Sequence, residues 1–527
     1  MPEQATFDIV VAGGGHNGLA AAAYLAKAGF KVCVLEAHDV YGGGVVTEEL
    51  TVPGFKHNTH AAFMVNIYTV KDELDLGKYG LEIIETGKAI SATFLDGKCI
   101  HLYTDVDRMC QQVEKFSKRD AAAWRELVET YKNTGPMFSA GRWANVAAQP
   151  SAMYLGFEGS IEGREFLKLM QMRPRDIVNN WFEDPYLKGL LFTWLNQAEM
   201  TDDSLGFGIM FVLYIACTAV GVQRWGVAKG GTGMVSHAMA RLIRDHGGLV
   251  KTSAKVTKIN TGNGIAKSVV TADGSEYIAR KAVISNINHQ ITLLDLVGED
   301  KIPAALAKKI KQWRWSEMVL FTPHLAFDEK VIWKSSDFDP EIQNSWGIGV
   351  LNDPPDTFWI SQFADIRMGR PPKELGFLGV FPTSADPSQA PPGKDVCLLW
   401  QFVPYNLADG GPLKWDEIKD GYTDQMIEFM QKFVKNDLRK AIAGRYIMSP
   451  LDVERKNPSM GHGSFMHGDL AQDQFGVFRP FHDYPVGKSP IENLYLCGDA
   501  GACAGDQGRR AAWLCLDDLK MKKWWEK

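Results

Sequence analysis

Residues 7–36 read FDIVVAGGGHNGLAAAAYLAKAGFKVCVLE. The run 7–11 is short and apolar, which is typical of a parallel strand buried on both faces. Glycines interrupt the apolar pattern within 13–18, and the Ala-rich stretch 19–28 predicts a helix. Residues 31–35 then predict a second strand. Together these segments predict a β-α-β unit of about thirty residues, and therefore an α/β fold with a parallel sheet.

The glycines of this unit follow the spacing Gly13-x-Gly15-x-x-Gly18. Gly13 permits a tight turn, Gly15 lets backbone N–H groups approach a pyrophosphate, and Gly18 lets the helix pack close to the strand. The helix N-terminus adds free N–H groups and a partial positive charge. Glu36 ends the second strand, where a carboxylate accepts hydrogen bonds from ribose hydroxyls. An acid at this place favours a ribose without a 2′-phosphate, which leaves NAD or FAD.

Two further segments favour FAD. Gly42-Gly43-Gly44, just after the second strand, gives close backbone access to the pyrophosphate and ribityl parts of the cofactor, although taken alone it also fits an ordinary turn. Near the C-terminus the apolar run 493–497 enters Gly498-Asp499, whose carboxylate can reach ribityl hydroxyls. The FAD-contacting residues predicted along the chain are Gly13, Gly15, His16, Asn17, Gly18, Glu36, Ala37, Gly42, Gly43, Gly44, Gly498, Asp499, Gln507 and Gly508.

The chain of 527 residues is long enough for two domains, and both are predicted to be discontinuous. Residues 1–74, 225–299 and 481–527 form the predicted Rossmann-type FAD-binding domain. Residues 75–224 and 300–480 form the predicted α+β substrate-binding domain, which includes a helical subdomain.

Apolar periodicity predicts the elements of each domain. In the FAD-binding domain we expect a helix over 234–246, strands over 249–259, 268–278, 281–285 and 493–497, and a turn at Asp273-Gly274. In the substrate-binding domain we expect helices around 106–116, 121–131, 164–195 and 422–434, and strands over 319–327 and 396–403.

Composition limits the classes of partner. A formal net charge of -6 with mixed signs along the chain gives no basic stripe, so nucleic acid is not expected as a partner. The eight cysteines include no C-x-x-C pair, so no zinc or other metal site is predicted. Scattered cysteines in a long chain fit a reducing compartment, and the first apolar run belongs to the fold. We therefore expect a cytoplasmic protein.

Residues 204–223, SLGFGIMFVLYIACTAVGVQ, carry no charge over about the length of a membrane span. They contain glycines and hydroxyl side chains, and charged residues flank them at Asp202, Asp203 and Arg224. We expect a buried segment that lines the substrate cavity. A peripheral, monotopic membrane contact is the first alternative, and a membrane span is the last.

The glycine unit, the glycine run after the second strand and the C-terminal Gly-Asp strand end resemble, in their order and separation, the phytoene-desaturase-like branch of the flavin amine oxidase superfamily. That branch includes carotenoid desaturases and retinol saturase. Further matches are TVPGFKHNTHAAF at 51–63, the stretch 225–259, ISNIN at 284–288, GHGSFMHGDLAQDQFGVFRP at 461–480 and NLYLCGDAG at 493–501. They cover both ends and the middle of the chain.

The resemblance implies that FAD is bound without a covalent link. It implies that Val256 touches the adenine through its backbone and that Gly498-Asp499 holds the ribityl chain. One segment departs from the family: relatives usually carry a His-Pro-Gly-Gly-type run after the last strand, whereas residues 500–507 read AGACAGDQ. This segment lies beside the flavin ring in the family, so the change argues against a carotenoid substrate and suggests more polar chemistry.

Three histidines are candidates for the catalytic base. In the family, the residues after Pro53-Gly54-Phe55 cover one face of the isoalloxazine, and here they include His57 and His60. Imidazole titrates near neutral pH, so either can act as a general base, and His60 is the preferred candidate. His467 is the third candidate. For each, the alternative is a hydrogen-bonded structural role.

Two arginines and a set of aromatic residues suggest further contacts, but the sequence leaves their partners open. Arg509 and Arg510 begin the last helix, where a cation opposes the helix dipole, so we expect an anionic partner: Asp499, Asp506, reduced flavin or substrate. Aromatic residues in the insertions suggest an apolar or aromatic substrate held flat against the flavin, although most must be core. These aromatic residues are Trp181, Trp194, Tyr214, Trp225, Trp313, Trp315, Trp400, Phe402 and Tyr405.

These patterns predict an FAD-dependent oxidoreductase that oxidises or desaturates a hydrophobic or aromatic small molecule by hydride transfer to flavin. No second G-x-G-x-x-G motif with an acidic partner is visible, so oxygen, a quinone or an internal redox-neutral cycle is the expected electron sink. The alternatives are a redox-neutral isomerase or C–C lyase, an amine oxidase, and a non-catalytic flavin-stabilised protein apposed to a membrane. The sequence does not indicate an oligomeric state.

Overall fold

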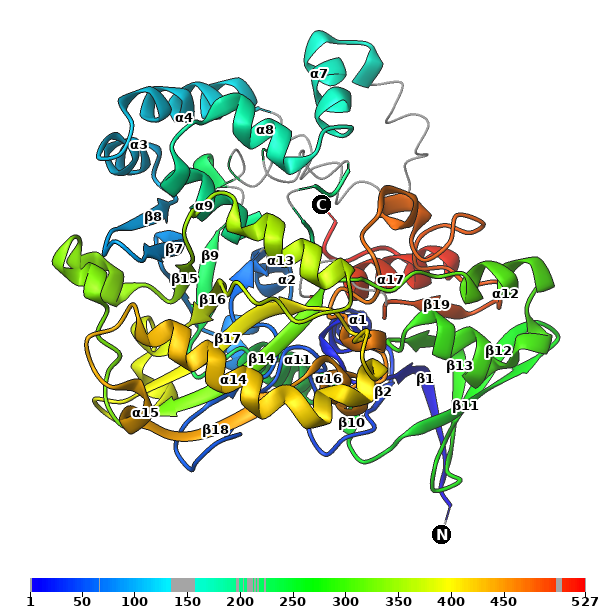
Figure 1. Ribbon diagram of the computed structural model, residues 1–527. Helices are drawn as coiled ribbons and strands as arrows, with labels where there is room; N and C mark the ends of the chain where they lie inside the picture. The colour runs from blue at the N-terminus through cyan, green and yellow to red at the C-terminus, as the bar shows by residue number, and fades with distance from the viewer. Residues whose placement is uncertain are drawn as a thin grey trace.

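The chain builds two large sheets, each joined to its own set of helices (Figure 1). In this computed structural model the described residues are 2–65, 67–133, 157–195, 199–201, 203–205, 212, 215, 218–221, 224–498 and 505–526. The N-terminal sheet carries the glycine motifs, and the second sheet is built from the two insertions.

The expected β-α-β unit is present. Strand β1 (Gln4–Ala12) leads into α1 (His16–Lys27), and β2 (Val32–Leu35) returns parallel to β1. Every residue of β2 and the last four residues of β1 are buried, because helices or strands cover both faces of a parallel sheet. Strand β10 (Leu249–Lys251) extends the sheet beyond β2. The prediction of an α/β fold with a Rossmann-type sheet is confirmed.

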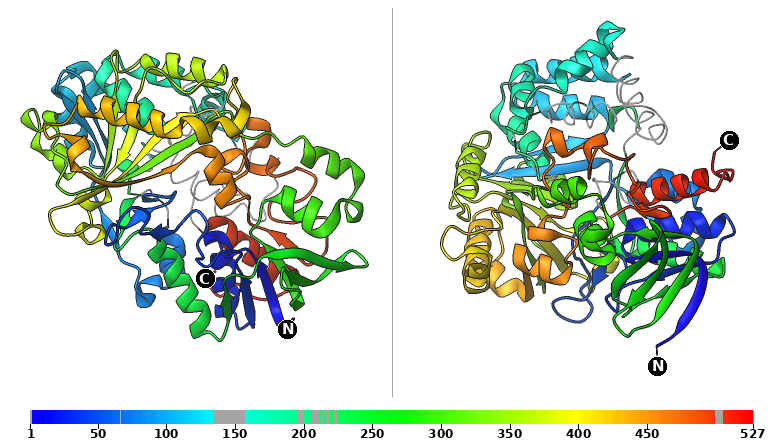
Figure 2. Two further views of the ribbon diagram at one scale, coloured as in Figure 1. Left: turned by 60° about the horizontal axis from the view of Figure 1, so that its bottom comes forward. Right: turned by 90° about the vertical axis from the view of Figure 1, so that its right-hand side faces the viewer.

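Distant segments complete this sheet. On the other side of β1 lies β13 (Glu276–Ser285), parallel to it, and β19 (Leu494–Leu496) pairs with the last residues of β13. Helix α1 packs against both α11 (Gly233–Asp245) and α17 (Asp506–Asp518). The views in Figure 2 show α17, near the C-terminus, beside the N-terminal sheet. The beginning, middle and end of the chain therefore meet around α1.

The prediction of one strand over 249–259 is wrong. The backbone turns at Ser253, whose φ is 52°, so the first residues join the parallel sheet as β10. Beyond the turn, β11 (Val256–Gly262) pairs antiparallel with β12 (Ile265–Thr271), and β12 pairs antiparallel with β13. The predicted break between 278 and 281 is also absent, because β13 is continuous and a shift in its register with β1 absorbs the irregularity.

The second sheet has the order β18-β14-β17-β16-β15-β7-β8. Its strands are β7 (Lys88–Phe94), β8 (Cys99–Tyr103), β14 (Val319–Phe327), β15 (Gly347–Leu351), β16 (Phe377–Val380), β17 (Asp395–Val403) and β18 (Ile442–Met448). Strands β7 and β8 come from the first insertion and the others from the second. Because β7 pairs parallel with β15, both insertions contribute to one sheet.

The two faces of this sheet pack against different partners. Successive side chains of a strand point to opposite faces, and on β14 Leu320 and Phe321 belong to different apolar clusters. Phe321 packs with α14 (Trp415–Gln431), which covers the outer face. Leu320 belongs to the cluster that includes Trp400 and several residues of the helical insertion. The inner face is therefore rich in aromatic side chains.

The helical stretch predicted over 164–195 divides into three helices, because α8 and α9 each begin with a proline, which is favoured at a first helical position. The helices of this insertion are α3 (Val106–Glu114), α4 (Lys118–Tyr131), α7 (Ile161–Leu169), α8 (Pro174–Trp181) and α9 (Pro185–Leu195). Further helices are α2 (Tyr68–Glu73), α12 (Ala304–Lys311), α13 (Phe358–Arg367), α15 (Leu438–Ala441) and α16 (Pro450–Lys456).

Two short sheets hold the segment that follows the second glycine run. Strand β3 (Thr47–Glu48) pairs with β4 (His57–Asn58). Strand β5 (Met64–Val65) pairs with β9 (Trp225–Ala228), which also pairs with β6 (Ile83–Glu85). Residues 57–65, which include His57 and His60, are thereby held at both ends by strand pairing.

Most of the uncharged stretch 204–223 lies outside the described residues. Among the helices that are described, none combines the length and the apolar composition needed to cross a bilayer.

The contact between α1 and α17 predicts an effect of Gly508. A Cβ atom at Gly508 would lie 2.0 Å from the backbone oxygen of Asn17, so alanine there must push the two helices apart. We expect Gly508→Ala to lower the free energy of unfolding by about 1–3 kcal/mol, as overpacking does. A Cβ atom at Gly421, on α14, would have no atom within 4 Å, and Gly421→Ala should raise stability by about 0.5–1 kcal/mol. Urea unfolding of both variants measures the two changes in the free energy of unfolding. An unchanged free energy of unfolding in Gly508→Ala would contradict the prediction.

Candidate active site

The loop between β1 and α1 requires its glycines. Gly13 has a φ of 92°, a left-handed conformation that favours glycine. A Cβ atom on Gly15 would lie 2.3 Å from Nδ2 of Asn286, and one on Gly18 would lie 2.4 Å from the backbone oxygen of Gly13. No side chain caps the N-terminus of α1. The first-turn N–H groups therefore keep their capacity to bind an anion.

The second glycine run lies against the first. The N–H of Gly42 donates to the oxygen of Gly14 at 2.9 Å, and the N–H of His16 donates to the oxygen of Gly42 at 3.1 Å. A Cβ on Gly43 would lie 3.1 Å from Cα of Gly15. We call residues 13–18 and 42–44 together the glycine cradle. Its two halves are separate in the sequence but are joined by backbone hydrogen bonds.

Glu36 stands at the edge of the glycine cradle. Its carboxylate accepts hydrogen bonds from the N–H of Gly14 at 2.8 Å and of His38 at 2.9 Å. The N–H of Ala254 donates to the backbone oxygen of Glu36 at 2.7 Å, so the start of β11 is fixed beside the end of β2. Val256, two residues further, is buried there. Ala37, next to Glu36, is exposed.

The C-terminal segment reaches the same place. A Cβ on Gly498 would lie 2.4 Å from the oxygen of Ile287, so the ends of β19 and β13 adjoin. The N–H of Gly505 donates to Oδ1 of Asn17 at 3.0 Å, which fixes the start of α17 against α1. Gln507 is partly buried in the first turn of α17. Asp499 and residues 500–504 lie outside the described residues.

Asn286 is a contact residue that the sequence reasoning missed. It follows β13, its N–H donates to the oxygen of Ala12 at 2.8 Å, and its side-chain amide lies next to Gly15 and Gly18. The sequence motif ISNIN includes Asn286, but nothing in the neighbouring residues indicates that its side-chain amide lies against the glycines. His16 adds a buried Nδ1 that has no hydrogen-bond partner within the described part of the chain. An uncapped helix, free amide donors and an acid at the strand end fit the phosphates and ribose of FAD.

Arg509 has an anionic partner, as expected, but this partner is a residue that the sequence did not suggest. Its guanidinium binds Glu73 of α2 with two hydrogen bonds, of 2.7 and 2.8 Å, and Tyr24 also donates to this carboxylate. Glu73 was not among the partners expected from the sequence, because nothing local relates residues separated by 436 positions. The pair fixes α17 to α1 and α2 and is a structural contact.

The three candidate bases do not have equivalent surroundings. His57 is 2% exposed, and its Nε2 lies 2.8 Å from Oγ1 of Thr51. Burial lowers the pKa of His57 to about 4. His467 follows a turn in which its N–H donates to the oxygen of Ser464 at 3.2 Å, and it is 8% exposed. His57 is therefore held by a hydroxyl, as expected for a structural histidine.

His60 adjoins the glycine cradle. The N–H of the next residue, Ala61, donates to the oxygen of Gly44 at 3.0 Å. Burial, and then the charges of Lys456 and His467, lower the pKa of His60 to about 4. The imidazole is consequently neutral near pH 7 and has a lone pair that can accept a proton. Of the three histidines, His60 combines this state with a position next to the cradle.

Two further titratable residues, His324 and Lys456, lie near His60, and neither was predicted from the sequence. His324 is fully buried on β14, its ring lies 5.5 Å from that of His57, and neither ring nitrogen has a hydrogen-bond partner in the described residues. Burial holds the pKa of His324 well below its usual range. Lys456 ends α16 and pairs with Glu48 at 2.6 Å. Across the described ranges, no group of three or more His, Cys, Asp or Glu side chains could hold a metal ion.

An aromatic wall begins three residues after His60. The Phe63 ring lies 5.5 Å from Trp225, 4.8 Å from Trp346 and 6.0 Å from Trp400, and Phe465 lies 6.2 Å from Trp400. We call these five residues the aromatic wall. Trp225 and Trp400 were expected near the substrate, whereas the sequence reasoning missed the other three. Tyr214 lies outside the described residues.

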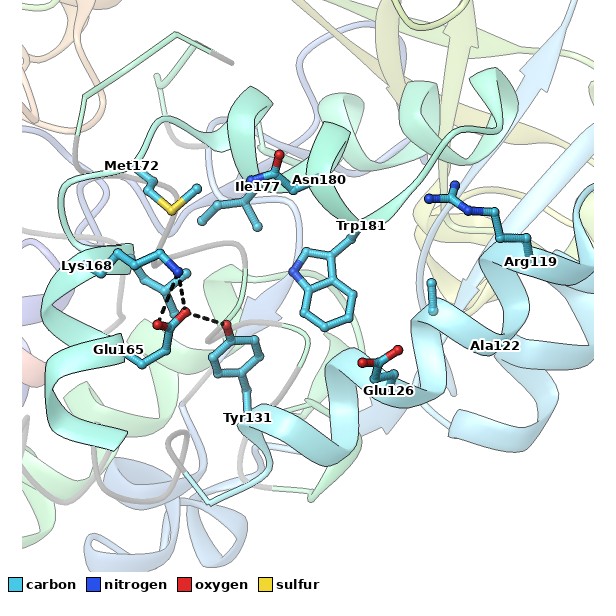
Figure 3. Close-up of a pocket in the computed structure, with 12 residues that line it drawn as sticks. Arg119, Ala122, Glu126, Tyr131, Glu165, Lys168, Met172, Ile177, Asn180 and Trp181 are labelled. Carbon is cyan, nitrogen blue, oxygen red and sulfur yellow. Dashed lines mark hydrogen bonds and ion pairs between the residues drawn. The ribbon is translucent and has the colours of Figure 1, made fainter. Parts of the chain in front are cut away.

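A separate cavity of about 590 Å³ lies among α4, α7 and α8 (Figure 3). Trp181 lines it, together with Tyr131 and Glu165, whose side chains are hydrogen-bonded at 3.3 Å. Lys168 also binds Glu165 at 2.9 Å. None of the residues that line this cavity belongs to the glycine cradle or the aromatic wall, so Trp181 is not part of the candidate active site.

The parallel sheet and the glycine cradle define an FAD-dependent oxidoreductase. The chain belongs to the family of flavin-containing amine oxidoreductases, whose family model matches residues 18–515. It is 28% identical to a limonene dehydrogenase subunit from Castellaniella defragrans, over 100% of this chain and 97% of the relative. It is 29% identical to pyridine nucleotide-disulfide oxidoreductase domain-containing protein 2 of Rattus norvegicus, over 98% of this chain and 94% of the relative.

The likeness extends to carotenoid enzymes and to a solved structure. Phytoene desaturase (lycopene-forming) of Pantoea ananas is 23% identical over 97% of this chain and 99% of its own. The structure of a putrescine oxidase bound to putrescine matches with a TM-score of 0.59 at 14% identity, over 98% of this chain and 100% of that one. The resemblance to the phytoene-desaturase-like branch and the prediction of FAD are therefore confirmed, whereas the structural match supports the fold alone.

Removal of the charge at the edge of the glycine cradle should weaken FAD binding. Glu36→Gln leaves a side chain that accepts fewer hydrogen bonds, and Asn286→Ala removes an amide donor. We expect each to raise the Kd for FAD about tenfold, as loss of a hydrogen bond to a buried polar partner does. Asp39→Asn, on an exposed neighbour, is the control. Fluorescence titration of the apoprotein with FAD measures the three constants, and wild-type affinity in Glu36→Gln would refute the assignment.

The neutral histidines predict acid sensitivity. His57 and His101 are both buried with a pKa of about 4, against 6.5 in an unfolded chain. Above pH 6.5 neither state takes up the proton, so these groups add no pH dependence. Between pH 6.5 and 4 only the unfolded state binds the proton. The free energy of unfolding therefore falls by about 1.4 kcal/mol for each group with every pH unit of acidification. Urea midpoints from pH 7.5 to 4.5 should show a shallower slope in His57→Gln and an unchanged slope in His246→Gln, an exposed control.

Proposed function

We propose that this protein is an FAD-dependent dehydrogenase of hydrophobic small molecules, of the size and character of a terpenoid. The juxtaposition of neutral His60 with the aromatic wall carries the proposal. A neutral imidazole next to the glycine cradle accepts a proton, and five aromatic side chains joined through Phe63 and Trp400 favour an apolar substrate. The likeness over the whole chain to a protein named for limonene oxidation supports the same substrate class.

The bound FAD supplies the hydride acceptor. The protein then has to orient the reacting C–H bond and remove a proton. For an alcohol, the carbinol carbon loses a hydride, the hydroxyl proton passes to Nε2 or Nδ1 of His60, and a carbonyl forms. For a desaturation, one carbon loses a hydride, its neighbour loses a proton to His60, and a C=C bond forms. In either case two electrons leave the substrate and His60 holds the proton.

The surroundings of His60 favour an uncharged substrate over an amine. Burial first, and then the charges of Lys456 and His467, lower the pKa of His60, because a further cation there is unfavourable. The same positive potential, together with burial, disfavours a protonated amine at this place. A phytoene-type polyene is the further candidate within the apolar class, and the changed segment 500–507 argues for a smaller or more polar molecule.

The electron acceptor is proposed to be oxygen or a quinone. No second dinucleotide motif with an acidic partner occurs in the sequence, so a dedicated nicotinamide domain is not expected. A quinone would be met at a membrane surface, and a peripheral contact through the uncharged stretch 204–223 is the alternative to a buried position for that stretch.

Anaerobic flavin reduction tests the proposed substrate class. The FAD-loaded protein is mixed with limonene, with perillyl alcohol, with phytoene in detergent, and with putrescine or cyclohexylamine, and absorbance near 450 nm is followed. We expect bleaching with a terpene or terpene alcohol and none with the amines. Bleaching by the amines alone would overturn the proposal. Substrate conversion without lasting bleaching would indicate a redox-neutral isomerase instead.

His60 should be required for reduction and not for cofactor binding. His60→Gln cannot accept the proton, and we expect the rate constant of flavin reduction to fall about 10²–10⁴-fold, the range of general-base catalysis. The visible spectrum and the Kd for FAD should stay within a factor of two or so. His38→Gln, an exposed histidine beside Glu36, is the matched control. A wild-type reduction rate in His60→Gln would show that another group takes the proton.

A further inference from the structure

Glu199 is a buried acid that the proposed chemistry does not use. Its side chain is 7% exposed, and its φ of 54° is a left-handed conformation that residues with a Cβ rarely adopt. It follows α9 in the first insertion. Its contacts lie 265 and 266 positions away along the chain, in the second insertion.

Both oxygens of the Glu199 carboxylate bind one loop, residues 461–470. Oγ of Ser464 donates to Oε2 at 2.6 Å, and the N–H of Phe465 donates to Oε1 at 2.9 Å. The N–H of Gly468 in turn donates to Oγ of Ser464 at 3.2 Å. Both of these contacts come from donors, so each oxygen of the Glu199 side chain acts as an acceptor.

The groups around this carboxylate act on it in opposite senses. Burial raises the pKa of Glu199 to about 8, while its hydrogen bonds with the loop and the guanidinium of Arg479 favour the charged form. Arg479 is buried too, and it donates to the backbone oxygen of Met466 within the loop. An acid and a base from different parts of the chain thus hold the same short loop.

The loop needs such contacts because its own backbone does not favour its shape. His462 and His467 have φ values of 53° and 58°, and neither is a glycine. Conformations of this kind persist only where surrounding contacts impose them. The contacts of Glu199 fall between these two histidines, at Ser464 and Phe465.

The same loop carries two parts of the candidate active site. The Phe465 ring belongs to the aromatic wall through Trp400. His467 lies close enough to His60 for its charge to lower the pKa of His60. A displacement of this loop would therefore alter both the apolar surface and the surroundings of the proposed base.

We infer that Glu199 is the positioning residue of loop 461–470. Its carboxylate fixes Phe465 against the aromatic wall and His467 beside His60, so the first insertion sets the geometry of a site built mainly by other segments. The meaning of this geometry for catalysis rests on the proposed function. The attachment of the loop by Glu199 does not.

The inference is tested with three variants of the FAD-loaded protein. Glu199→Gln keeps the length of the side chain but leaves one acceptor oxygen for two donors. Ser464→Ala removes one of the two contacts without a change at Glu199, and so covers the case in which Glu199→Gln does not fold. Glu165→Gln makes the same acid-to-amide change in the same insertion, where the acid pairs with Lys168 at the surface. Hydrogen exchange by mass spectrometry, thermal unfolding and anaerobic reduction by limonene are measured for each.

We expect amide exchange in peptides that span 461–470 to quicken about tenfold in Glu199→Gln and Ser464→Ala and to stay unchanged in Glu165→Gln. The limiting rate of flavin reduction should fall about tenfold to a hundredfold in the first two variants, as misplacement of reacting groups does. The limonene concentration at half-saturation and the Kd for FAD should change less than threefold.

Wild-type exchange of this loop in both variants would overturn the inference. So would faster exchange with an unchanged reduction rate, because the loop would then be attached by Glu199 without positioning the reacting groups. If limonene and the other terpenes fail to reduce even the wild-type flavin, the proposed function fails, and the exchange result still decides whether Glu199 attaches the loop.

Discussion

The uncapped N-terminus of α1 is the feature on which the rest of the structure depends. Unpaired N–H groups at a helix start are costly to leave without a partner, and they concentrate positive potential. The backbone of both glycine runs approaches this point, and the side chain of Asn17 holds the start of α17 there. An anionic phosphate satisfies these groups. The proposed cofactor site therefore lies where the beginning, middle and end of the chain meet.

The two insertions add a surface of aromatic side chains to this backbone site. Strands from both insertions share one sheet, and its inner face presents aromatic side chains toward the segment that carries His60. Under the proposed function, glycines and backbone amides bind the cofactor, whereas large side chains select the substrate. Relatives named for limonene and phytoene match this chain over almost its whole length, and a putrescine oxidase shares the fold.

Burial dominates the electrostatics of the site. It lowers the pKa values of His57, His60 and His324, which are held neutral within a region that also contains Lys456. These histidines have few hydrogen-bond partners, and both ring nitrogens of His324 have none in the described structure. Such surroundings accept a proton only transiently. Under the proposed function, they suit a base that takes a proton during turnover and passes it on.

The sequence by itself determined the β-α-β unit and the glycine motif with Glu36, because each depends on residues close together in the chain. The choice of FAD came from the order of separate motifs, which a sequence shows without any knowledge of their contacts. Apolar periodicity also located β14 and most helices, but it joined β10 to β11, since alternation continues through the turn at Ser253.

Only the tertiary structure decided that Asn286 lies beside Gly15, that Arg509 pairs with Glu73, and that Glu199 holds the loop of His467. These contacts join residues hundreds of positions apart. Local pattern reports which face of an element is buried, but it carries no information about which distant side chain completes a buried hydrogen bond.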